Sequence, residues 1–276
     1  MKVEIIGPRA VVATCLLLTA LSVVLRLHLN ESWGVRFSGD CRFLVVGVWD
    51  KKAYLYSTET WKQVGFMQRN DRVYSVSISH NADRIAVAGR DCMAVVYERT
   101  NLHEPIFTAE YPSFIYSVAL SSSGRFLALG GVAKDVWLFD VDQRMELFRF
   151  RQDHVTWSVD FSSDERALCM GGESTCMDLW NIEDVAQSQR AKRILRMDRS
   201  DLVHSVRFGG SALGFCSGST ACLYGLGGDN AYGWEDRPGY EVAASMLSHP
   251  EGLQYMLSTW PALSNATNPQ SESWQS

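Results

Sequence analysis

Three charged residues of this chain could act together: Arg36, Asp160 and Arg207. Each ends a short segment that recurs along the sequence, and the three segments read GVR, SVD and SVR. If the segments are equivalent strands that converge on one axis, the three side chains share a face. An unpaired buried carboxylate is costly, so a buried Asp160 needs such partners. The pattern therefore predicts either an ion pair at the rim of a channel or a small anionic ligand held by the two arginines.

An aromatic residue or a histidine precedes the small residue of each segment. Tyr and Trp dominate the binding energy of protein interfaces, so a repeated position of this kind is a candidate binding surface. By strand parity, however, these residues share a face with the valines that follow the small residue, and this favours packing between neighbouring units. We expect packing first, and keep them as the first candidates for binding partner proteins. They are Trp33, Tyr74, Tyr116, Trp157 and His204.

The sequence contains no pattern that activates a nucleophile or holds a cofactor. Most of the small residues are serines, but none lies in a GxSxG elbow, and crowding where strands converge explains their size. There is no P-loop, HExxH or dinucleotide fingerprint. We therefore expect no catalytic residue, no cofactor and no metal ligand. The small residues are Gly34, Ser75, Ser117, Ser158 and Ser205.

The chain has seven cysteines, most of them in or beside expected strands, and contains no CxxC. Free cysteine behaves as a small hydrophobic residue, and this usage favours a reducing compartment. Two pairs bracket single hairpins and keep a disulfide or a metal pair open as an alternative. These pairs are Cys169 with Cys176, and Cys216 with Cys222.

These residues belong to a repeat of about 40 residues, and the stretch 114–140 shows it best. That stretch reads as three apolar β-forming segments separated by small turn residues, which is typical of a meander. The small residues of successive copies are 41, 42, 41 and 47 positions apart. Outer fourth strands are expected over 61–67, 105–109 and 145–150, and near 193–197. A sixth, weaker copy begins near Ala244.

A period of this length with four strands per unit resembles the WD-repeat (tryptophan-aspartate repeat) β-propeller family. The resemblance covers 24–260: a glycine closes each second strand, and an aromatic residue ends the third. The chain is a divergent member by this pattern, since the Trp-Asp pair is absent from the third strands and the Gly-His pair is missing. Phe139–Asp140 and Trp180–Asn181 come nearest.

The resemblance implies an all-β propeller of four-stranded antiparallel blades. We expect six blades over 24–262, with the alternating strand Val24–Leu29 completing the last one and removing exposed edges. It also implies a non-catalytic, cytoplasmic scaffold that binds partner proteins or peptides on its top face. A propeller enzyme or a small-anion binder that uses the channel residues is one alternative.

The two ends differ from the repeat. Residues 1–23 combine a basic start with an apolar run and resemble a signal or anchor. The uncharged stretch, residues 10–25, is short for a membrane span. Glycosylation sequons at Asn30 and Asn265 keep open a secreted or membrane-anchored propeller that binds an extracellular ligand. Residues 263–276 read as a disordered polar tail. The net charge of −5 argues against a nucleic-acid partner.

Overall fold

The computed structural model describes residues 32–199, 201–209, 212–217, 220–225 and 240–243. Within them, twenty strands form five antiparallel sheets, and each sheet uses four strands that follow one another in the chain. The first sheet contains β1 (Ser32–Phe37), β2 (Phe43–Val48), β3 (Lys52–Ser57) and β4 (Gln63–Gln68). The second contains β5 (Val73–Ile78), β6 (Arg84–Gly89), β7 (Met93–Glu98) and β8 (Asn101–Glu110).

The remaining three sheets have the same order. The third contains β9 (Ile115–Leu120), β10 (Phe126–Gly131), β11 (Asp135–Asp140) and β12 (Met145–Arg151). The fourth contains β13 (Thr156–Phe161), β14 (Ala167–Gly172), β15 (Cys176–Asn181) and β16 (Lys192–Asp198). A short helix, α2 (Val185–Ser188), lies in the connection before β16. The fifth contains β17 (Val203–Gly209), β18 (Ala212–Ser217), β19 (Thr220–Gly225) and β20 (Tyr240–Ala243).

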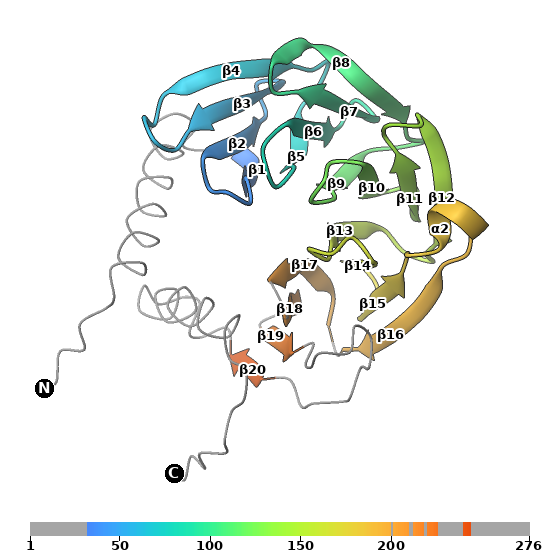
Figure 1. Ribbon diagram of the computed structural model, residues 1–276. Coiled ribbons are helices and arrows are strands. Elements are labelled where there is room, and N and C mark those ends of the chain that lie inside the picture. The colour runs from blue at the N-terminus through green and yellow to red at the C-terminus, as the bar shows by residue number, and fades with distance from the viewer. Residues whose placement is uncertain (1–31, 200, 210–211, 218–219, 226–239, 244–276) are drawn as a thin grey trace, which may run out of the picture.

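The five sheets follow one another around a common centre, as in a β-propeller (Figure 1). The first strand of each sheet lies nearest the centre, and consecutive first strands are in contact: β1 with β5, β5 with β9, β9 with β13, and β13 with β17. The prediction of an all-β chain built from four-stranded antiparallel units is confirmed, as are the four predicted outer strands. The predicted terminal segments 1–23 and 263–276, the closing strand 24–29 and the sixth copy from Ala244 lie outside the described residues.

The core lies between neighbouring sheets. One cluster joins Val45 and Leu55 of the first sheet to Val73 and Ile85 of the second, and similar clusters join the sheets that follow. Second strands are therefore covered on both faces, and β14 is buried along its whole length. This double burial explains why these strands read as continuous apolar runs rather than as an alternating pattern.

Close backbone approach explains the glycine that closes the second strands. A Cβ atom at Gly89, Gly131 or Gly172 would collide with a backbone carbonyl oxygen that lies just before the first strand of the same sheet. In the second sheet, that oxygen belongs to Arg72. Only glycine fits at this position in these three sheets, whereas the equivalent position holds Val48 in the first sheet and Ser217 in the fifth.

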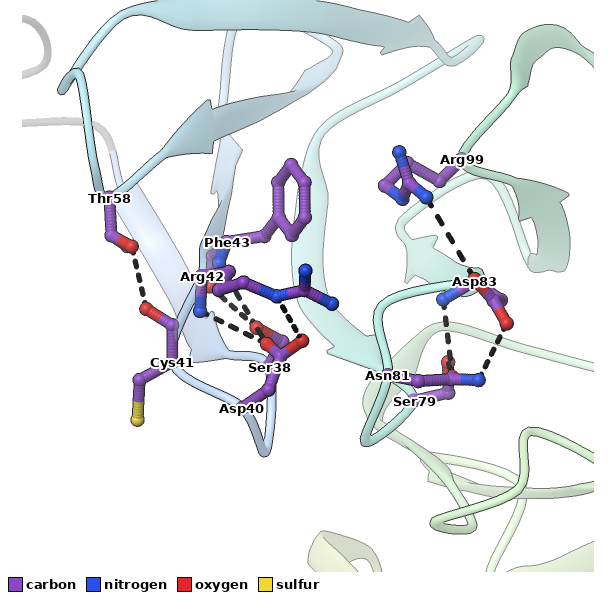
Figure 2. Close-up of polar contacts among 10 residues, drawn as sticks. All are labelled: Ser38, Asp40, Cys41, Arg42, Phe43, Thr58, Ser79, Asn81, Asp83 and Arg99. Carbon is purple, nitrogen blue, oxygen red and sulfur yellow. Dashed lines mark hydrogen bonds and ion pairs between the residues drawn. The ribbon is translucent and has the colours of Figure 1, made fainter.

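A serine holds the turn between the first and second strands. The hydroxyl of Ser38 accepts the N–H of Phe43 at 3.0 Å and donates to Asp40 at 2.6 Å. Figure 2 shows this turn around Ser38. Ser79 accepts the N–H of Arg84 in the same way, and Ser121 and Ser162 repeat the contact in the next two sheets. In each of these turns, the third residue after the serine adopts a left-handed conformation; these residues are Cys41, Ala82, Gly124 and Glu165.

A second set of serines joins neighbouring sheets near the centre. The hydroxyl of Ser75 accepts the N–H of Val118 at 3.1 Å, Ser117 accepts that of Val159 at 3.0 Å, and Ser158 accepts that of Val206 at 3.1 Å. Gly34 occupies the same position in the first sheet, where an added Cβ would lie 3.1 Å from the nitrogen of Val76. The repeated position is therefore small because the strands converge, and three of its serines also bond across the sheets.

The bond from Val159 to Ser117 predicts a measurable contribution to stability. Both residues are buried, so Ser117→Ala leaves a backbone N–H without an acceptor and should lower the free energy of unfolding by about 1–3 kcal/mol. Urea denaturation measures the change. Ser163→Ala, at an exposed turn, is the control and should change stability little. Equal effects of the two variants would contradict the role of the inter-sheet bond.

Candidate functional site

The position predicted for partner binding has a special backbone in every described sheet. Pairing between the first and second strands skips one residue: in the first sheet, Ser32 pairs with Val48 and Gly34 with Gly47, leaving Trp33 between them. The other four sheets show the same irregularity. A β-bulge of this kind re-aims the side chain of the extra residue. The extra residues are Trp33, Tyr74, Tyr116, Trp157 and His204.

These five residues, which we call the aromatic collar, all line one cavity of about 750 Å³, which we call the central hollow. They contact one another around it: the ring of Tyr74 lies 5.1 Å from that of Trp33 and 5.8 Å from that of Tyr116. The rings of Trp157 and His204 stack at 5.1 Å with 10° between their planes. The collar thus brings together residues that are up to 171 positions apart, from Trp33 to His204.

The collar residues pack on one another across neighbouring sheets, but they do not join the valines in the buried core as their parity predicts. Val76, Val118, Val159 and Val206 are buried between sheets, at 2% exposure or less. Trp33 is 58% exposed, His204 is exposed, and the other three collar residues are half-buried. The bulge breaks the two-residue period of the strand, so parity with the valines does not carry across it.

Two of the three predicted charged residues, Arg36 and Arg207, line the central hollow, and Asp160 contacts Arg36. Arg36 Nη2 lies 3.5 Å from Asp160 Oδ1, so the first sheet is bridged to the fourth across the centre. The other carboxylate oxygen of Asp160 accepts the N–H of Phe208 at 2.9 Å. Arg207 Nη1 donates to Ser158 Oγ at 2.9 Å and to the carbonyl oxygen of Val206 at 2.7 Å. The predicted ion pair between Arg36 and Asp160 is present.

Burial and like charge both disfavour the positive charge of Arg36. Desolvation is the larger cause and the neighbouring Arg207 is the second; together they lower the pKa of Arg36 to about 10, although Asp160 opposes them. Two guanidinium groups of the lining therefore lie close together, and the carboxylate of Asp160 pairs with one of them. Such a site can hold a ligand through hydrogen bonds and through the attraction of opposite charges.

The nucleophilic groups beside the central hollow are occupied or neutral. The hydroxyls of Ser75, Ser117 and Ser158 accept hydrogen bonds from neighbouring backbone. Burial raises the pKa of the Cys169 thiol, which donates to the carbonyl oxygen of Asp160 at 3.4 Å, so the thiol stays protonated. A protonated, buried thiol is a poor nucleophile.

The alternative disulfide between Cys169 and Cys176 is not formed, because both are free thiols. The side chain of Cys222 lies outside the described residues, so the pair of Cys216 with Cys222 stays a prediction. Among the described residues, no group of three or more His, Cys, Asp or Glu side chains could hold a metal ion. No helix in the described ranges is both long and apolar enough to span a membrane.

Loops contribute lining residues that the repeat alone did not identify as part of a site. Val132 and Glu173 come from turns between second and third strands, and Val155 comes from the turn before β13. The place of Glu173 beside the central hollow depends on how the sheets converge. Neither a protein-family model nor a curated protein matches this chain.

Asp160→Asn tests the charge balance of the central hollow. The amide can still accept the N–H of Phe208, but Arg36 loses its counter-charge while Arg207 stays close to it. Because both partners of the ion pair are partly exposed, we expect the free energy of unfolding to fall by only about 1 kcal/mol. Urea denaturation at low and high salt measures it, and the loss should shrink as salt screens the arginines. Asp153→Asn, at an exposed loop, is the control; a loss no larger than in the control would contradict the account.

Proposed function

We propose that this chain is a non-catalytic interaction scaffold that binds a partner protein or peptide at the aromatic collar. The observation that carries the proposal is the collar itself: five bulges turn five aromatic or histidine side chains toward one central hollow. Aromatic side chains offer large contact area and lose little conformational entropy on binding. A cavity of about 750 Å³ has the size of a site for a short peptide segment or a small molecule.

Two features support a binding role over a propeller enzyme. The collar lies at the end of the sheets where the first strands begin, and Trp33 is largely exposed, so a partner can reach it. The serine hydroxyls and the Cys169 thiol are held in structural hydrogen bonds or stay protonated. A non-catalytic scaffold accounts for both features.

We further propose that the chain is a divergent WD-repeat β-propeller with six blades. Val35 of β1 is 43% exposed, whereas its counterparts in the four other described sheets are 2% exposed or less. A sheet that covers this face would bury Val35 as the other valines are buried. Residues 244–262, completed by the strand Val24–Leu29, are our candidate for that sheet. β20 ends at Ala243, directly before the copy read near Ala244.

We propose a cytoplasmic location, because the free thiols of the described strands fit a reducing compartment. The alternative is a secreted or membrane-anchored propeller, in which residues 1–23 would be a signal or anchor. Intact mass of protein from its native cell separates the two. The full chain without glycan supports the cytoplasm, and loss of about 23 residues or added glycan supports export.

Partner binding should depend on the collar. Full-length protein and the double variant Tyr116→Ala/Trp157→Ala, both tagged, would be used to recover partners from the native cell with quantitative mass spectrometry. We expect specific partners to fall at least about tenfold with the variant, because aromatic anchors carry most interface energy. Trp61→Ala is the control, because Trp61 does not line the central hollow. Equal recovery of partners by the collar double variant and by the Trp61→Ala control would contradict the proposal.

The closing strand can be tested by truncation. Removing residues 1–23 should leave the melting temperature unchanged. Removing residues 1–29 should lower it by several degrees, because the last sheet then loses the hydrogen bonds to its closing strand. Circular dichroism against temperature measures both. Equal melting temperatures of the two truncated chains would contradict a closing strand at Val24–Leu29.

A further inference from the structure

The charge of Arg207 is not neutralised within the described part of the chain. None of the described carboxylates lies within 4.0 Å of its guanidinium, and Asp160 pairs with Arg36. The hydrogen bonds of Arg207 to Ser158 and Val206 both use Nη1. A guanidinium has five N–H donors in a planar fork, so Nε and Nη2 retain donors for a ligand.

Arg36 and Arg207, which line the central hollow, and Asp160, which pairs with Arg36, carry one excess positive charge together. Arg207 lies close enough to disfavour the charge of Arg36, and Asp160 offsets only one of the two positive charges. Glu173 is the acidic residue of the lining, but it lies exposed on the turn between β14 and β15, where water screens it. A local positive site in a chain of net charge −5 marks a place where an anion would be stabilised.

We propose that the partner segment presents a carboxylate, which enters the central hollow and binds Arg36 and Arg207. This inference rests on the proposed function, since it names the group that the aromatic collar admits. Apolar side chains next to that carboxylate would pack on the collar, for example against the stacked rings of Trp157 and His204. Arginine forks bind carboxylates with short, strong, charge-assisted hydrogen bonds.

Charge balance favours a carboxylate over the other ligands that this site could attract. A carboxylate carries one negative charge and matches the single excess positive charge, whereas a phosphate ester carries nearly two and would face Asp160 as well. Aromatic faces attract cations, but two guanidinium groups below the collar would repel a lysine or arginine. The carboxylate can belong to an Asp or Glu side chain or to a chain end, and the experiment separates these sources.

The test selects peptides from a random phage-displayed library on the full-length protein, discarding peptides that also bind Trp157→Ala. Enriched sequences are then synthesised with either a free or an amidated C-terminus, and with each acid replaced by its amide. We expect one acidic position, or the free C-terminus, to be shared among them. Its neutralisation should weaken binding about tenfold or more, as should Arg207→Gln or Arg36→Gln. The control Arg144→Gln, at an exposed turn, should leave affinity unchanged.

Each other outcome overturns a defined part of the account. Collar-dependent peptides that lack a shared acid, or that bind equally as amides, refute the carboxylate and leave the scaffold function standing. If a peptide with phosphoserine at the acidic position binds about tenfold better, the group that the site recognises is a phosphate and not a carboxylate. If no peptide depends on Trp157, the proposed peptide-binding function itself is refuted. Thermal unfolding of each arginine variant checks that the fold is retained. If one arginine variant does not fold, the other carries the test.

Discussion

The hydrogen bonds between first strands are the constraint on which the rest of the structure depends. Ser75, Ser117 and Ser158 each accept a backbone N–H from the first strand of the next sheet. Strands this close leave room only for small side chains, so the sheets converge on a centre and their outer strands spread apart (Figure 1). The same convergence creates the interfaces in which the valines are buried.

The β-bulge converts this packing constraint into a candidate binding site. Immediately before each small residue, one extra residue leaves the ladder, and its side chain turns from the sheet interface to the central hollow. Two residues past the small one, Arg36 and Arg207 line the same hollow, and Asp160 pairs with Arg36. One short segment of the repeat thus supplies the inter-sheet bond, the aromatic collar and the charged group.

The sequence predicted the strands and the charged group because both follow from simple periods. Copies 41 to 47 residues apart identify the sheets, and residues at one position of each copy, such as Arg36 and Asp160, must meet if the sheets converge. The bulge could not be predicted, because Trp157 and Val159 share parity in an uninterrupted strand. The turn role of Ser38 and its equivalents was also missed, since a serine after an apolar strand reads as an ordinary turn residue.

Photo-crosslinking in the native cell tests the central claim, that partners bind at the aromatic collar, most directly. A benzophenone amino acid would replace Tyr116 in the collar and, in a second protein, Phe66 on the outer strand β4. The account predicts that position 116 crosslinks to a discrete partner, that position 66 does not, and that the Trp157→Ala change removes the product. Crosslinks of equal yield and identity from both positions would contradict it.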